Sequence, residues 1–146
     1  MSKGNTFEND LLQLIFNNVD IADIGDAGGL QNSATAGSLY VALHTSDPGE
    51  AGTAATNETA YTNYARQAVA RSGAGWTVSG NQATNASQIT FPQCGVTGAT
   101  ITHVSITTAS SGSSKILYSG ALNSSLAVAE NITPLFAASG LTVTED

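Results

Sequence analysis

The stretch SLYVALHTSDPG, residues 38–49, decides the fold. Leu39, Val41 and Leu43 point to one side of an extended chain and the residues between them to the other, which is the period of a β-strand. The turn residues Asp47-Pro48-Gly49 then follow and end the strand. This segment therefore predicts a short strand closed by a tight turn.

Similar segments, separated by turn residues, recur through the rest of the chain. We expect strands at about Tyr64–Arg71, Trp76–Ser79, Gln88–Phe91, Thr100–Thr108, Lys115–Ser119, Ala121–Val128 and Leu141–Thr144. Short strands with this spacing are typical of sandwiches and jelly rolls. We predict a mainly β fold, in which residues 20–146 form a single antiparallel β-sandwich or jelly-roll-like domain with a long loop at about 48–63.

The N-terminal segment, residues 1–19, carries helical signals instead. Its apolar side chains recur at helical spacing: Phe7, Leu11, Leu14 and Ile15. Asn5, with Glu8 three positions later, fits a capping box. We predict one α-helix over about residues 6–18. Its apolar stripe has two interpretations, docking on the protein's own sandwich or insertion as an anchor into a groove of another subunit.

The composition restricts the partners of this 146-residue chain. Charged residues make up 10% of it, and eleven acidic against four basic residues give a formal net charge of −7. Affinity for phosphate chains comes mainly from Lys and Arg, so we expect no nucleic-acid partner and no anionic membrane surface. Cys94 is the single cysteine, which excludes an internal disulfide. The sequence shows no signal peptide and no apolar run of membrane-spanning length, so we expect synthesis and folding in cytoplasm.

No residue set in the sequence predicts catalysis. His44, Ser46 and Asp47 are close in sequence, but neighbours in a strand-to-turn segment do not aim at one another as a triad requires. We expect His44 at a solvent-facing strand end. Cys94 has no catalytic signature around it, and we expect a buried structural thiol.

Metal and cofactor sites have equally little support. Asp20, Asp23 and Asp26 lack the spacing of an EF-hand, which predicts a solvated acidic loop. His44 and His103 have no second ligand at zinc-site spacing. No glycine pattern matches a phosphate-binding loop. We predict no enzyme activity, no metal and no cofactor.

A second group of residues has the composition of a protein interface. Tyr61, Tyr64, Arg66 and Arg71 bring together half of the tyrosines and half of the basic residues. Tyr and Arg are enriched at binding hot spots. Internal salt bridges with the abundant carboxylates are the alternative. We therefore carry both sets as candidate interface residues, Phe7, Leu11, Leu14, Ile15, Tyr61, Tyr64, Arg66 and Arg71.

Several segments resemble a family of small structural proteins of tailed bacteriophages. The similarity lies in MSKGNTFENDLL at residues 1–12, SLYVALHTSDPGEAG at 38–52, YAR at 64–66, GW at 75–76, ITFP at 89–92 and KILYSG at 115–120. Members of this family are labelled tail or tail-fibre proteins, or capsid decoration (cement) proteins. The resemblance implies a virion structural protein and no catalytic residues.

Of the two virion locations, the sequence favours the outer capsid surface. It has no heptads, collagen-like triplets or long β-helical repeats, through which fibres become long. We expect a cement protein that binds the major capsid protein, bridges neighbouring subunits and self-associates as a dimer or trimer. A tail or tail-fibre component for host adsorption, with a possible glycan-binding site, is the alternative, and a small hydrolase is a weaker one.

Overall fold

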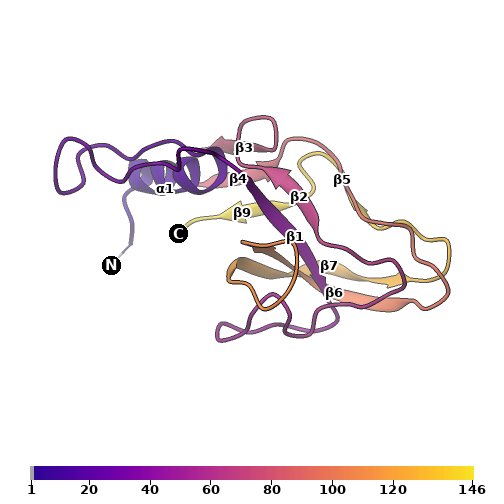
Figure 1. The fold of residues 1–146 in the computed structure, drawn as a ribbon. Coiled ribbons are helices and arrows are strands. Elements are labelled where there is room, and N and C mark those ends of the chain that lie inside the picture. The colour runs from indigo at the N-terminus through magenta and orange to yellow at the C-terminus, as the bar shows by residue number, and fades with distance from the viewer. Residues whose placement is uncertain (1) are drawn as a thin grey trace. The chain divides into compact units, whose positions relative to one another are not determined.

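The computed structural model of the chain describes residues 2–146, in which one helix and nine strands follow one another (Figure 1). Two compact units are formed. Unit 1 contains the chain up to Ser38, Val69–Ile89 and Phe136–Asp146, and unit 2 contains Leu39–Ala68 and Thr90–Leu135. The elements are α1 (Asn5–Asn17), β1 (Ser38–His44), β2 (Gln67–Ala70), β3 (Trp76–Ser79), β4 (Gln82–Asn85), β5 (Ile89–Thr90), β6 (Ala99–Thr107), β7 (Ile116–Val128), β8 (Leu135–Phe136) and β9 (Thr142–Thr144).

Unit 1 is a small helix-on-sheet layer. Its three strands are ordered β3-β4-β9 and are antiparallel, and α1 packs against β3 and β4. The contact is aromatic at its centre, where the rings of Phe16 and Trp76 lie 4.7 Å apart at 60°. Leu12, Phe16 and Trp76 are fully buried. The helix therefore docks on this unit's own sheet, which was the first of the two interpretations of its apolar face.

The helix differs in detail from its prediction. It spans Asn5–Asn17, and Gly4 rather than Asn5 is the N-cap, with no side-chain capping bond. Its buried residues are Glu8, Leu12 and Phe16. Each lies one position after a residue of the predicted stripe, so the buried face of the helix is displaced by one residue from the prediction. Apolar residues occupy most positions between 11 and 16, so periodicity alone does not fix which side faces the sheet.

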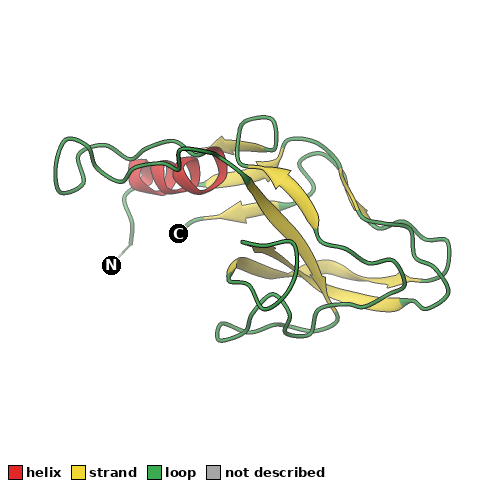
Figure 2. Ribbon diagram, viewed as in Figure 1, coloured by secondary structure: helices red, strands yellow, loops and turns green. Residues whose placement is uncertain are grey.

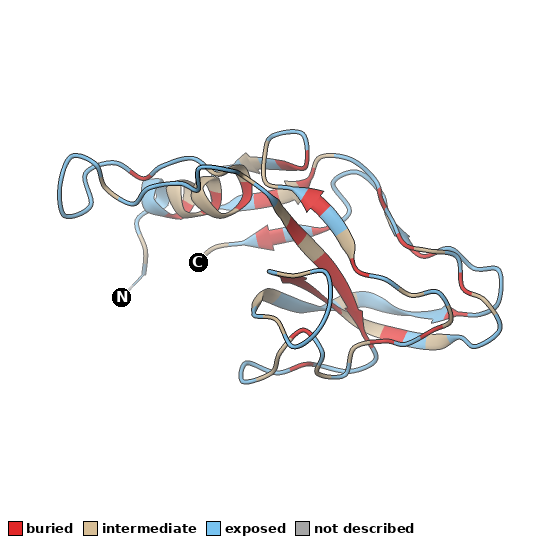
Figure 3. Ribbon diagram, viewed as in Figure 1, coloured by how far each residue is buried: buried red, intermediate tan, exposed pale blue. Residues whose placement is uncertain are grey.

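Unit 2 contains β6, β7, β1 from Leu39 onward and the first two residues of β2, in a sheet with the strand order β2-β1-β6-β7. β1 and β6 are antiparallel, with Val41 opposite Ile106 and His44 opposite His103. From Val41 onward every residue of β1 is buried (Figure 3). Both sides of the strand are therefore buried in the second half of β1, where the loop that carries Thr56 covers His44.

Mainly β structure with antiparallel sheets and one N-terminal helix is confirmed within residues 2–146 (Figure 2). β3 has its predicted bounds, whereas the strand predicted at Tyr64–Arg71 is shortened to Gln67–Ala70. The two strands predicted on either side of Gly120 are one element, β7. β4 and β8 were not predicted, because neither short segment has a period that sequence analysis can recognise.

Candidate functional site

The polar cluster of unit 2 lies where two loops meet. One loop follows β1 and carries Glu58, Tyr64 and Arg66, and the other joins β6 to β7 and contains Gly112. Loops that cover a sheet must find hydrogen-bond partners for their own backbone groups, since buried unpaired groups are costly. In this cluster side chains supply those partners.

Arg66 is the centre of the cluster, and its side chain is 1% exposed. Nε and Nη2 donate to the two carboxylate oxygens of Glu58, each at 2.7 Å. Nη2 also donates to the carbonyl of Gly112 at 2.8 Å. Nη1 donates to the carbonyl of Ala109 at 2.9 Å and to Ser114 Oγ at 3.0 Å. A guanidinium has five N–H donors, so all of them are used inside the chain.

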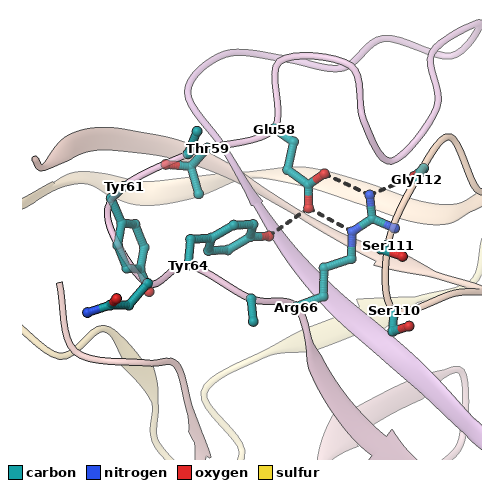
Figure 4. A pocket seen from close by; sticks show the side chains of 11 residues that line it. Glu58, Thr59, Tyr61, Tyr64, Arg66, Ser110, Ser111 and Gly112 are labelled. Atoms are coloured by element: carbon teal, nitrogen blue, oxygen red, sulfur yellow. Dashed lines mark hydrogen bonds and ion pairs between the residues drawn. The ribbon is translucent and has the colours of Figure 1, made fainter. Parts of the chain in front are cut away.

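Tyr64 connects this ion pair to β1 through hydrogen bonds. Its hydroxyl accepts from the backbone N–H of Leu43 at 3.0 Å. The same hydroxyl donates to Glu58 Oε1 at 2.9 Å (Figure 4). Burial is the main cause that raises the pKa of Tyr64 above its ordinary value, and the hydrogen bond with Glu58 raises the pKa of Arg66. Both groups therefore keep their protons, and the cluster as a whole is electrically neutral.

His44 forms a second buried polar contact and is fully buried, not solvent-facing as the sequence suggested. Its Nδ1 lies 2.9 Å from the carbonyl of Thr56, and its Nε2 lies 2.8 Å from Ser105 Oγ. Because a carbonyl only accepts, Nδ1 carries the proton and Nε2 accepts from the Ser105 hydroxyl. Burial lowers the pKa of His44 below its ordinary value. The imidazole is thus held neutral as part of the packing.

No catalytic triad is formed around His44. The carboxylate of Asp47 accepts from the backbone N–H of Gly49 at 2.8 Å, which confirms the predicted turn. Ser46 and Asp47 are exposed, whereas His44 is buried. Its hydrogen-bonding partners are the carbonyl of Thr56 and the hydroxyl of Ser105, and because Ser105 is buried as well, neither member of this pair is exposed to a substrate.

A cavity of about 480 Å³ opens beside the Glu58–Arg66 pair (Figure 4). Its lining includes Tyr61, Tyr64 and the loop at Ser110–Gly112. Thr59 also lines it, and the buried Thr59 hydroxyl has no hydrogen-bond partner. With Arg66 and Glu58 bonded to each other, the cavity offers hydroxyl, amide and aromatic groups but no unpaired charge from this pair.

The residues predicted as one basic and aromatic group are divided between the two units. Tyr61 and Tyr64 lie edge-on, with ring centroids 5.4 Å apart, and the Tyr61 hydroxyl donates to the carbonyl of Pro92 at 2.9 Å. Burial raises the pKa of Tyr61 to about 12. Arg66 forms the internal salt bridge that was its alternative interpretation. Glu58, its partner, was not singled out, because the loop at 48–63 has no period to place it.

Arg71 lies in unit 1 and binds carbonyl groups in the last turn of α1. Its Nη2 donates to the carbonyl of Leu14 at 2.6 Å and its Nε to that of Ile15 at 2.7 Å. The last carbonyls of a helix lack intrahelical partners and carry partial negative charge, so a guanidinium there is stabilising. Of the predicted helical stripe, Phe7 is 39% exposed, and Leu11, Leu14 and Ile15 are half-buried.

The remaining candidates have ordinary structural surroundings. Cys94 is a buried free thiol, as predicted. Asp20 and Asp26 accept hydrogen bonds from backbone N–H groups of their own exposed loop. Within residues 2–146, no group of three or more His, Cys, Asp or Glu side chains is placed to hold a metal ion. No helix in that range is long and apolar enough to cross a membrane.

Comparison with protein families identifies a match. A family model described as podophage GP4 fiber I protein gp80 matches residues 2–144, and therefore segments of both units. No curated protein matches the sequence.

Proposed function

Because the chain belongs to the podophage GP4 fiber I protein gp80 family, whose members are phage virion structural proteins, we propose that it is a non-catalytic subunit of the phage tail fibre. The observation that carries the proposal is the extent of the match, residues 2–144 of a 146-residue chain. Both units are therefore part of what the family shares. In this proposal the protein contributes a mostly β building block to the adsorption apparatus.

The side chains that sequence analysis considered for chemistry support a structural role. Arg66 has no donor left for a ligand, and both nitrogens of His44 are bonded inside the chain. Cys94 is buried. A group that catalyses must reach substrate, and none of these three is free to do so. Their contacts instead fix the loops that cover the sheet of unit 2.

Capsid decoration is the second candidate function, and one observation favours it. The sequence contains no heptad, collagen-like or β-helical repeat that would lengthen a fibre. A tail-fibre role would therefore make this chain a short segment or an adaptor. A decoration role would place it on the outer shell against the major capsid protein, where many copies gain avidity from weak contacts.

A binding experiment distinguishes the two roles. Purified protein is mixed with isolated tails and, separately, with tailless expanded capsids, and the bound protein is measured after sedimentation. The fibre proposal predicts saturable binding to tails prepared without this protein and none to capsids. Binding to capsids alone, at a stoichiometry that follows the number of major capsid subunits, would replace the fibre proposal with the decoration role.

A further inference from the structure

The cavity of about 480 Å³ beside the Glu58–Arg66 pair has the size of a small-molecule site (Figure 4). Pockets that bind small ligands have volumes of about 300–1,000 Å³ and carry a few fixed polar groups. The residues that line this cavity, 58–61, 63–66 and 110–112, all belong to unit 2. Its shape therefore does not depend on how the two units are arranged.

One wall of the cavity is a loop that Arg66 holds in place. The guanidinium donates to the carbonyl of Ala109 at 2.9 Å and to that of Gly112 at 2.8 Å. These two bonds flank Ser110 and Ser111, which are exposed. The two serine hydroxyls are thus presented by a loop that is fixed on both sides. A preorganised wall of this kind loses less conformational entropy when a ligand binds.

A second wall follows β1 and is also fixed by hydrogen bonds. The backbone N–H of Thr59 donates to the carbonyl of Leu43, and that of Tyr64 donates to the carbonyl of Tyr61, each at 2.9 Å. The ring of Tyr64 is half-buried. Thr59 is 3% exposed, and its hydroxyl has no hydrogen-bond partner. A buried polar group without a partner is costly, so a ligand hydroxyl that pairs with Thr59 is favoured.

The cavity presents no unpaired charge. Among the described residues that line it, Glu58 and Arg66 are the charged ones, and they neutralise each other at 2.7 Å. A charged ligand would lose its hydration there without meeting a free opposite charge. An apolar ligand would displace water from the hydroxyls of Ser110 and Ser111 and replace none of its hydrogen bonds. A neutral ligand that carries several hydroxyls avoids both costs.

We propose that this cavity binds a neutral sugar residue of a glycan on the host surface. Each sugar hydroxyl both donates and accepts hydrogen bonds, as do the hydroxyls of Thr59, Ser110 and Ser111. The C–H face of the sugar ring lies against the ring of Tyr64, whose π-face carries partial negative charge. The inference rests on the proposed function for the source of the sugar, because a tail fibre meets the host surface.

Titration of the full chain, followed by nuclear magnetic resonance, tests the site. The probes are methyl glycosides of glucose, galactose, mannose, rhamnose and N-acetylglucosamine, each added up to about 50 mM. At least one of them should shift the amide signals of residues 58–66 and 110–112 saturably, with a dissociation constant of about 1–10 mM. Glucuronic acid, which carries a negative charge, should bind at least about tenfold more weakly.

Two variants and a matched control assign the contacts. Ser110→Ala/Ser111→Ala removes two hydroxyls from the cavity and should weaken binding at least about fivefold. The control Ser124→Ala/Ser125→Ala removes two adjacent, exposed hydroxyls of β7 that do not line the cavity, and it should have no effect. Thr59→Val should weaken binding about threefold without lowering the urea midpoint, because the hydroxyl that it removes has no partner in the free protein.

Three results would overturn the inference. The first is the absence of a saturable shift with every one of the neutral glycosides. The second is binding that Ser110→Ala/Ser111→Ala weakens no more than Ser124→Ala/Ser125→Ala does, and the third is a set of shifts spread evenly over both units. A protein that binds isolated tails but no glycoside would refute the sugar site alone. One that binds a glycoside in this cavity and capsids alone would refute the fibre proposal alone.

Discussion

Replacement of Arg66 by methionine tests whether the buried ion pair holds the loops of unit 2 in place. The change removes five hydrogen bonds and leaves the Glu58 carboxylate and the carbonyls of Ala109 and Gly112 without their partner. Removing one member of a buried pair costs about 3–5 kcal/mol. The Glu58 side chain is 18% exposed, and water can solvate part of its charge, so we expect about 3 kcal/mol.

The chain supplies a separate optical signal for each unit. Its single tryptophan, Trp76, lies in unit 1, and its four tyrosines all lie in unit 2. Urea unfolding is followed by near-ultraviolet circular dichroism of the tyrosines and, in parallel, by Trp76 fluorescence. If the free energy of unfolding falls by about 2 kcal/mol per molar urea, Arg66→Met should lower the urea midpoint of the tyrosine transition by about 1.5 M.

A double variant separates the unpaired charge from lost packing. Glu58→Gln/Arg66→Met removes both charges while it keeps an acceptor for the Tyr64 hydroxyl, and it should recover at least about half of the lost stability. A tyrosine midpoint that Arg66→Met leaves unchanged would refute the reasoning. A double variant no more stable than the single one would show that the loss comes from packing and not from the uncompensated carboxylate.

Three further predictions concern single residues. Burial lowers the pKa of His44 below its ordinary 6.5, so the unfolded chain takes up a proton before the folded chain as the pH falls. The stability that the neutral imidazole contributes is therefore complete above about pH 6.5 and decreases below it. Urea midpoints at about pH 7.5 and 5 should differ more for the unaltered protein than for His44→Asn, and equal differences would contradict a buried neutral His44. Arg71→Met removes the donors to carbonyls in the last turn of α1 and should lower the urea midpoint seen by Trp76 fluorescence by about 0.5–1 M. A change confined to the tyrosine signal would show that Arg71 does not stabilise unit 1. Gly52→Ala would put a Cβ 2.0 Å from the carbonyl oxygen of Pro48, and it should lower the free energy of unfolding seen by the tyrosine signal by about 1–3 kcal/mol. The matched variant Gly49→Ala meets no atom within 4 Å and is opposed only by the positive φ of 71° at that position. A larger loss of stability for Gly49→Ala than for Gly52→Ala would contradict the geometry.

Features that depend on local sequence were predictable. The strand at Ser38–His44 and the turn at Asp47 follow from period and turn chemistry, and β3 from the same signals. The buried side of α1 could not be predicted in this way, because the surface around Trp76 determines which apolar residues of the helix face the sheet. The burial of His44 likewise depends on loops that arrive from later in the chain.

The candidate site was predicted in part. Tyr64 and Arg66, which were placed in one group, both bind Glu58, and for Arg66 this contact is the internal salt bridge of the alternative interpretation. Arg71 was grouped with them by residue type, although alternation along the predicted strand would have put it on the opposite face; β2 ends at Ala70, and Arg71 donates to carbonyls of α1. Glu58 was missed because an aperiodic loop gives no sign of which carboxylate will meet an arginine.

The location of the protein in the virion is the central claim, and one measurement tests it most directly. Purified virions are imaged by cryo-electron microscopy, and the copies of this chain per virion are counted by quantitative mass spectrometry. The fibre proposal predicts density that fits unit 1 and unit 2 within the tail fibres and a copy number that matches the symmetry of the tail. Hundreds of copies distributed over the outer shell would contradict it and assign the protein to capsid decoration.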